Sequence, residues 1–131
     1  KVPAGLTEKA ENLLNFVGLY QKRNLRGGDL SFGQQKLLEL AMALMNEPKM
    51  LLLDEPTAGI NPTLINGIID RLITINKDYG ITLLVIEHNM KVIMSLAQKI
   101  FCLAHGKMLA EGSPDQIKND KRVVDAYLGA Q

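Results

Sequence analysis

The sequence predicts an α/β fold in which mostly parallel strands are flanked by helices. The run from Met50 to Leu53 is apolar at every position and leads into Asp54 and Glu55, as expected for a strand buried on both faces. A second apolar, β-branched run covers 81–86, and a helical pattern lies between the two runs. Alternation of strand and helix is typical of α/β proteins, so we expect both strands in one sheet.

The region before the first strand predicts two helices. Thr7 can cap the first, and Gly18 is a suitable C-terminal stop. Apolar residues of this helix recur at helical spacing: Ala10, Leu13, Leu14 and Val17. A polar, basic loop covers 19–29, and the second helix runs from the LSFGQQ segment to about Met45. Its apolar stripe consists of Leu37, Leu40, Ala41 and Leu44.

The region after Glu55 predicts further alternation. Asn61 caps the next helix, and Pro62 occupies its first position, where proline is favoured. Beyond the 81–86 strand we expect a helix over 90–98 and strands over 99–104 and 107–110. A capping box over 113–116 and a final helix over 121–128, with Val124, Tyr127 and Leu128 on one face, complete the prediction.

We expect a single partial domain with three parts. The helical part covers 1–48, the strand-rich core covers 49–112, and the C-terminal helices cover 113–131. No internal repeat, linker or low-complexity tract interrupts the 131 residues. The first residue is Lys1 and no signal-peptide pattern follows, so we expect that the chain has been cut from a longer one.

Composition excludes several classes of function. Hydrophobic residues make up 47% and charged residues 22%, a globular balance. The net charge is +1 and there is no basic block, so a nucleic-acid partner is not expected. The single cysteine, Cys102, excludes an internal disulfide and fits a reducing compartment. No apolar run approaches the roughly 20 residues of a membrane span.

Three motifs stand at the ends of predicted elements: LSFGQQ opens a helix, LLLDEP closes a strand, and IEH closes the next strand. Ser31 and the backbone N–H groups of a helix N-terminus could hold a phosphate, and Gly33 would allow a close approach. Asp54 and Glu55 at a strand end need a cation or a protonated partner. Simpler explanations are also available: Ser31 could be an ordinary N-cap, Asp54 and Glu55 could be solvated by water at the strand end, and His88 could have a structural role.

In this order, the three motifs resemble the C-terminal half of an ABC-transporter ATPase subunit, a P-loop NTPase domain, over nearly the whole chain. The resemblance implies that the signature residues contact the γ-phosphate of ATP held by an opposing subunit: Ser31, Phe32, Gly33 and Gln34. It implies that Asp54 holds Mg²⁺, that Glu55 activates the attacking water and that His88 senses the γ-phosphate. Asn61 corresponds to a position in the loop after the acidic pair and would belong to the nucleotide-binding residues, although helix capping alone could explain it. In the same loop, Gly59 would serve backbone geometry.

The chain departs from the family pattern in several places. Phe32 stands where the family usually has glycine, and Asn61 stands where it usually has aspartate. No G-x-x-x-x-G-K-[ST] segment occurs, and Gly106-Lys107 lacks the surrounding residues of one. The family's phosphate loop lies before the signature motif, so the N-terminal half that carries it is absent from this sequence. We therefore expect that this chain alone neither binds ATP tightly nor hydrolyses it.

The resemblance also implies partners and a place in the cell. The DEPTAGINP and IEHNM segments and the C-terminal YLG are most similar to subunits of branched-chain amino-acid importers. The alternative within the family is an ATPase of the lipopolysaccharide-export type. Two alternatives of other classes are a non-catalytic interaction module that keeps the half-fold and an acidic-edged regulatory domain. We expect a second ATPase subunit and permease subunits as partners on the cytoplasmic face of the inner membrane. The solute would not touch this chain, and the chain alone would self-associate through its uncovered sheet.

Overall fold

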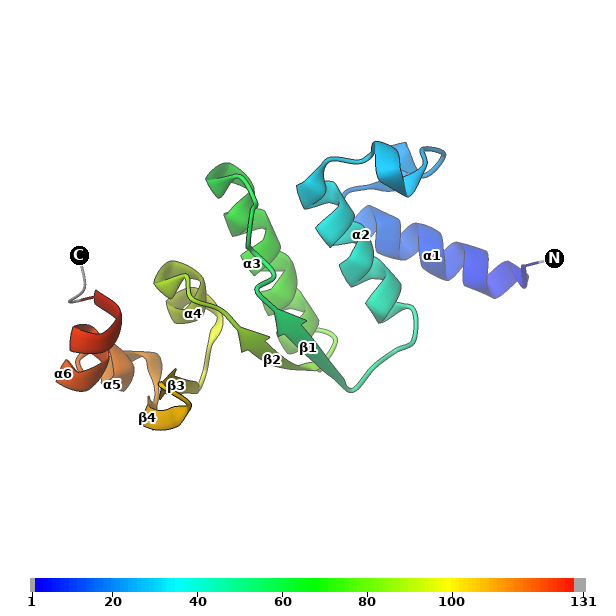
Figure 1. Ribbon diagram of the computed structural model, residues 1–131. Coiled ribbons are helices and arrows are strands. Elements are labelled where there is room, and N and C mark those ends of the chain that lie inside the picture. The colour runs from blue at the N-terminus through cyan, green and yellow to red at the C-terminus, as the bar shows by residue number, and fades with distance from the viewer. Residues whose placement is uncertain (1, 129–131) are drawn as a thin grey trace. The chain divides into compact units, whose positions relative to one another are not determined.

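A computed structural model describes residues 2–128 and divides into two compact units, one ending at Glu87 and the other beginning at His88 (Figure 1). The elements alternate as the sequence predicts, and helices flank a parallel pair of strands in the first unit. The two units are divided at one point of the sequence, after Glu87. The division into 1–48, 49–112 and 113–131 rests on the motifs and stays a prediction. No helix among the described residues is both long enough and apolar enough to cross a membrane.

The first unit begins with two helices, α1 (Ala4–Phe16) and α2 (Phe32–Leu44), connected through short 3₁₀ turns at Tyr20–Lys22 and Gly27–Asp29. They pack around a small buried cluster: Val17, Leu19, Leu30 and Ala41. Gly18 ends α1 as predicted. Its φ is 77°, and the N–H of Leu19 returns to the carbonyl of Leu14 at 2.7 Å, as in a Schellman motif.

The predicted start of α1 at Thr7 is wrong. The N-cap position is Pro3, whose carbonyl accepts from the N–H of Leu6 at 3.1 Å, so Thr7 lies inside the helix. Pro3 is extended, with φ −57° and ψ 138°, and its missing N–H costs nothing at a helix entrance. The proline therefore allows the helix to begin one turn earlier than the threonine indicates.

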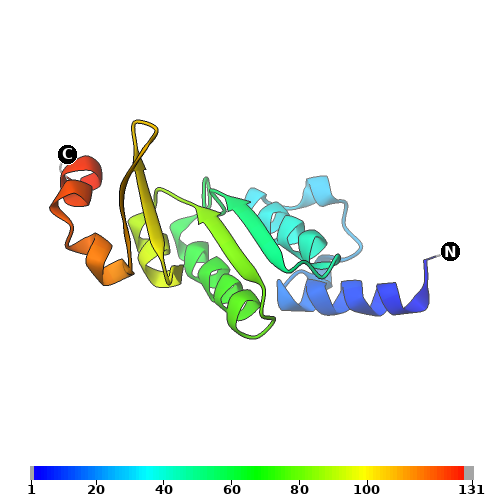
Figure 2. The ribbon, with the colours of Figure 1, turned by 90° about the horizontal axis from the view of Figure 1, so that it is seen from below.

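The centre of the first unit is a parallel pair of strands, β1 (Met50–Asp54) and β2 (Thr82–Ile86), joined by α3 (Pro62–Lys77). The strands pair in register from Met50 opposite Thr82 to Asp54 opposite Ile86. Figure 2 shows α3 lying along one face of the strands. Four residues of α3 are buried: Ile68, Ile69, Leu72 and Ile75. The 3.6-residue period of the sequence predicts a stripe of Ile65, Ile68, Ile69, Leu72 and Ile73. Three of these are buried, Ile65 and Ile73 are only partly buried, and Ile75 is a buried residue that the period did not include.

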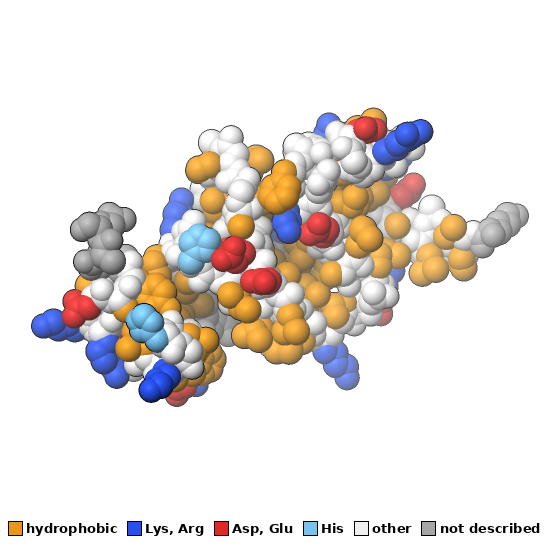
Figure 3. Space-filling model, viewed as in Figure 1, with side chains coloured by type: hydrophobic (Ala, Val, Ile, Leu, Met, Phe, Trp, Pro, Cys, Tyr) orange, Lys and Arg blue, Asp and Glu red, His pale blue; other side chains and the backbone are white. Residues whose placement is uncertain are grey.

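The opposite face of β1 and β2 is open within the described residues, so the expectation of burial on both faces is wrong for this chain. Hydrophobic side chains gather over these strands in Figure 3. The most exposed of them are Met50, Leu52, Leu84 and Ile86, whose exposed fractions are 50%, 71%, 48% and 62%. The continuous apolar sequence is that of a doubly covered strand, but these residues provide a helix for only one face.

The paired helices of the first unit are attached to α3 and its flanking turns. Arg71 on α3 donates from Nε to the carbonyl of Phe16 at 3.2 Å, and the ring of Phe16 lies 5.4 Å from that of Tyr79. Lys9 forms an ion pair with Glu47 that lowers the pKa of this carboxyl. These contacts attach the end of α1 to α3 and the body of α1 to the turn after α2.

The second unit contains α4 (Met90–Leu96), β3 (Ile100–Ala104), β4 (Lys107–Gly112) and α5 (Pro114–Lys118). The two strands form an antiparallel hairpin with an irregularity between Cys102 and Leu103. His105 and Gly106 form its turn, both at positive φ of 50° and 74°, as expected for a tight hairpin. The core of this unit is formed by Ile100, Cys102, Ala110, Ile117 and Val123.

The predicted last helix is present but changes its pitch. α6 (Lys121–Val123) passes into a π-helical turn over Val124–Leu128. Val123 is the residue buried in the core, whereas Val124 is only partly buried and Tyr127 is exposed. The Tyr127 hydroxyl donates to the carbonyl of Leu103. The wider turn thus places an aromatic hydroxyl on the hairpin, an outcome that the apolar spacing does not indicate.

We predict that Leu72→Ala lowers the free energy of unfolding by about 2–5 kcal/mol, because its fully buried side chain leaves a cavity between α3 and the strands. Leu25→Ala, at a residue with an exposed fraction of 51%, should cost less than about 1 kcal/mol. Urea unfolding followed by circular dichroism compares the two variants. Equal losses would contradict the packing described here.

Candidate functional site

The acidic pair lies at the carboxyl edge of the parallel strands. Asp54 is the last residue of β1 and Glu55 follows it, and both side chains are exposed. The N–H of Glu55 donates to the carbonyl of Ile86 at 2.8 Å, which extends the ladder one residue beyond β1. Glu55 then adopts a φ of 45°, a left-handed conformation that is uncommon for a residue with a side chain. The chain turns sharply away from the sheet at this point.

The loop after Glu55 is folded on itself and tied to β2. Ala58 donates its N–H to the carbonyl of Glu55 at 3.0 Å. Thr57 is only 5% exposed, and its N–H donates to Oε1 of Glu87 at 3.0 Å. The Thr57 hydroxyl donates to the same oxygen. The sequence analysis missed both residues of this pair, because no local pattern connects positions thirty residues apart.

The LSFGQQ segment opens α2 as predicted. Ser31 is the N-cap, its Oγ accepts from the N–H of Gln34 at 3.4 Å, and the Gln34 side chain accepts from the N–H of Ser31 at 3.1 Å. This is a capping box. Gln35, which the sequence analysis left without a role, donates to the carbonyls of Leu30 and Gly27 at 3.2 and 3.3 Å. Side-chain hydrogen bonds from Ser31, Gln34 and Gln35 thus hold the backbone at the start of α2.

The start of α2 packs directly on the loop that follows the acidic pair. A Cβ built on Gly59 would lie 3.1 Å from Cε1 of Phe32, and Gly59 has a φ of 70°. A Cβ built on Gly33 would lie 3.6 Å from Leu64 and 3.9 Å from Ile60. Gly59 serves backbone geometry, as the sequence indicated. The structure thus brings Phe32 and Gly33 together with the acidic loop, inside one compact unit.

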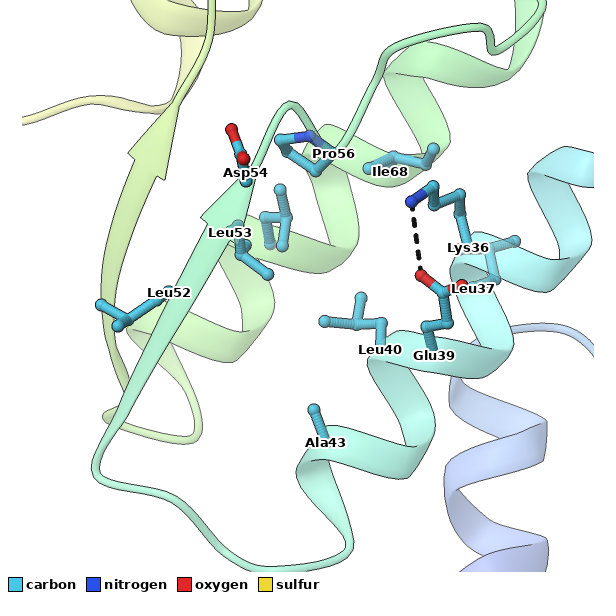
Figure 4. A pocket seen from close by; sticks show the side chains of 11 residues that line it. Lys36, Leu37, Glu39, Leu40, Ala43, Leu52, Leu53, Asp54, Pro56 and Ile68 are labelled. Carbon is cyan, nitrogen blue, oxygen red and sulfur yellow. Dashed lines mark hydrogen bonds and ion pairs between the residues drawn. The ribbon is translucent and has the colours of Figure 1, made fainter.

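A cavity of about 190 Å³ lies between α2, β1 and α3 (Figure 4). Its walls are mostly apolar, and Leu40 and Ala43 of α2 face Leu53 and Pro56 across it. Lys36 and Glu39 form an ion pair of 3.4 Å at its mouth, and Asp54 lies at its rim. The cavity therefore connects the signature helix to the edge of the sheet that carries the acidic pair.

Asn61 and His88 differ in how the structure places them. Asn61 caps α3, since its Oδ1 accepts from the N–H and the hydroxyl of Thr63 at 3.1 and 2.9 Å, which confirms the capping prediction. His88 is exposed and is the first residue of the second unit. Asn89 after it caps α4 through the N–H groups of Lys91 and Val92. The ligand roles assigned to Asn61 and His88 stay predictions.

The acidic edge suits one kind of metal better than others. The described residues contain no group of three or more His, Cys, Asp or Glu side chains that could enclose a metal ion. Mg²⁺ often binds through only one or two carboxylates and completes its shell with water and phosphate oxygens. Asp54, one of the two exposed carboxylates at this edge, fits that arrangement, and the pair offers too few ligands for a closed zinc or calcium site.

Comparison with known families identifies two matching sequence profiles. The profile described as ABC transporter matches residues 5–58. The profile described as Branched-chain amino acid ATP-binding cassette transporter matches residues 107–131. The first match includes the LSFGQQ segment and the acidic pair, and the second includes β4 and the C-terminal helices.

Curated relatives and solved structures agree with these profiles. A probable branched-chain amino acid transport ATP-binding protein, LivG of Archaeoglobus fulgidus, is 38% identical over 96% of this chain and 49% of that protein. BraF of Pseudomonas aeruginosa, a high-affinity branched-chain amino acid transport ATP-binding protein, is 38% identical over 93% of this chain and 48% of that protein. The chain therefore spans about half the length of the curated relatives it matches.

Two solved structures share the fold. MJ1267, an ATP-binding cassette of an ABC transporter in its ADP conformation, superposes with a TM-score of 0.87 at 36% identity over 98% of this chain and 52% of that chain. cbiO1 from Clostridium perfringens, part of the ABC transporter complex cbiONQ, superposes with a TM-score of 0.82 at 30% identity over 98% and 53%. The predicted fold class is thus confirmed.

We predict that Ser31→Ala and Ser113→Ala each lower the free energy of unfolding by about 1 kcal/mol, because each serine caps a helix through the same capping box. Thermal unfolding of the two variants measures this loss. A clearly larger effect of Ser31→Ala on stability would show that Ser31 has a structural contact beyond the cap.

Proposed function

Because this chain belongs to the family of ABC transporter ATP-binding subunits, we propose that it is the C-terminal half of such a subunit and supplies the hydrolytic side of an ATP site. One observation supports this most directly. The signature residues at the start of α2 pack on the loop that follows Asp54 and Glu55, through Phe32 against Gly59. Within one chain, the motif that would contact the ATP of the opposing subunit is thus packed against the loop beside the acidic pair of the chain's own ATP site.

Each residue has a role in the proposed site. Ser31, Phe32, Gly33 and Gln34 present the N-terminus of α2 to the γ-phosphate of ATP bound by an opposing subunit. Asp54 holds Mg²⁺, which would neutralise developing charge on the phosphate oxygens when bound. Glu55 orients or deprotonates the attacking water, and His88 donates to the γ-phosphate. Asn61 adds a contact across the subunit interface besides its cap.

The phosphate loop that would hold the nucleotide belongs to the half of the protein outside this sequence. A glycine-rich loop and its lysine supply backbone N–H groups and a positive charge to the β- and γ-phosphates, so most of the affinity for ATP comes from that half. The chain alone would therefore present catalytic groups without a bound substrate. We propose that it is inactive by itself.

The complete subunit would power import of branched-chain amino acids. The relatives LivG and BraF are named for that transport. Two such subunits would enclose ATP and dock on permease subunits at the cytoplasmic face of the membrane. The solute would be selected by the membrane partner, and nucleic acid has no part in the scheme.

We predict that the complete protein hydrolyses ATP in the presence of Mg²⁺ and that Glu55→Gln lowers kcat at least about 100-fold, because the amide cannot accept a proton from the attacking water. Ser31→Ala should also lower turnover, whereas Ser113→Ala, with the same cap in the second unit, should not. The rate of phosphate release is measured for the unmodified protein and for the three variants. Micromolar ATP affinity of the 131-residue chain alone, or full activity of Glu55→Gln, would contradict the proposal.

We also predict that the chain alone self-associates, because the open face of β1 and β2 exposes Leu52 at 71% and Ile86 at 62%. Leu52→Lys should shift the chain toward monomer in size-exclusion chromatography with light scattering. Leu25→Lys is the matched control, since Leu25 is 51% exposed in a loop away from this face. A monomeric unmodified chain, or equal effects of both lysines, would rule out this face as the contact.

A further inference from the structure

We propose that Glu87 is a positioning residue for Glu55. Glu87 binds Thr57 in the loop that follows Glu55, and holding this loop fixes the direction of the Glu55 side chain. The geometry is a carboxylate at the end of β2 that accepts two hydrogen bonds from one residue of the loop after β1. The catalytic part of this inference depends on the proposed function, because it assumes that Glu55 acts on water.

The parallel register brings the two ends together. Asp54 is opposite Ile86, so Glu55 and Glu87 leave their strands at the same level of the sheet. Glu55 is held there by its N–H bond of 2.8 Å to the carbonyl of Ile86. Two residues later, the N–H of Thr57 meets Oε1 of Glu87 at 3.0 Å. The segment between Glu55 and Thr57 is therefore anchored at both ends to β2.

The anchoring has a reason in the backbone of Glu55. A φ of 45° is unfavourable for a residue with a side chain and persists only where the surroundings enforce it. Relaxing this angle would swing the Glu55 side chain away from its present direction. Since Pro56 alone separates Glu55 from Thr57, a fixed Thr57 leaves the backbone of Glu55 little freedom to relax. Thr57 itself is 5% exposed, so its donors depend on protein acceptors rather than on solvent.

A second contact supports the same loop from the other side. The ring of Phe32 lies where a Cβ on Gly59 would come within 3.1 Å, and Ile60 is buried at 7%. The loop is thus held at Thr57 by Glu87 and contacted at Gly59 by the ring of Phe32. Glu87 provides the polar contact to this loop. Its charge can be removed with almost no change in side-chain size by Glu87→Gln.

The test compares variants of Glu87 in two experiments. Hydrogen exchange of the 55–60 segment in the 131-residue chain should become at least tenfold faster in Glu87→Ala than in the unmodified chain. Glu87→Gln should exchange within about threefold of the unmodified chain, because the amide oxygen can accept both bonds. Glu111→Ala is the matched control, since this carboxylate pairs with Lys99 at 3.7 Å and both side chains are exposed.

Kinetics of the complete protein provide the second readout. Glu87→Ala should lower kcat for ATP about tenfold or more with KM changed less than about twofold, and Glu87→Gln should restore most of kcat. Thr57→Val, which loses the hydroxyl and keeps the N–H, should give an intermediate kcat and serves if Glu87→Ala does not fold. The inference is overturned if Glu87→Ala exchanges and turns over like Glu111→Ala, or if Thr57→Val matches the unmodified protein in both measurements.

The two proposals can fail separately. A complete protein without ATPase activity would reject the proposed function, while the exchange of the 55–60 segment would still decide whether Glu87 holds the loop. Normal activity with unchanged exchange in Glu87→Ala would keep the function and reject the role of Glu87.

Discussion

The parallel pairing of β1 with β2 is the constraint on which the first unit depends. Its register sets Asp54 opposite Ile86, so the residues after both strands emerge at one edge. A slip of one residue would turn Asp54 toward α3 and Leu53 toward the open face, because successive side chains of a strand alternate. Burial of Leu51 against α3 opposes such a slip. The apolar core therefore determines where the acidic pair stands.

Local rules predicted much of this arrangement from sequence. Asn61 and Ser31 cap their helices as expected, because an N-cap needs only a side-chain oxygen and an N–H two or three residues later. Gly18 and Gly59 take positive φ values where a stop and a turn were expected. The order of motifs predicted the family, since each motif stands at a strand or helix end that short-range periodicity locates. The start of α1 was predicted wrongly, because the rule that threonine favours the N-cap selected Thr7 and Pro3 occupies that position instead.

Features that depend on distant partners could not be predicted in the same way. Thr57 and Glu87 have no shared spacing that marks them, and their contact follows only from the register of the two strands. The exposed Leu52 is another case, because its neighbours in sequence indicate a strand covered on both faces, while no described element covers the face that carries Leu52. The π-helical turn after Val123 is a third case, since its Tyr127 hydroxyl donates to the carbonyl of Leu103, a residue far away in sequence.

The unusual Phe32 of the signature segment has a structural counterpart in the same chain. A large ring at the start of α2 can lie on the acidic loop only if the loop has no side chain there, and Gly59 meets that condition with its φ of 70°. A glycine at position 32 would remove this ring contact from the loop. Phe32 and Gly59 thus form a complementary pair, and the phenylalanine that stands where the family usually has glycine attaches the start of α2 to the loop that follows Glu55.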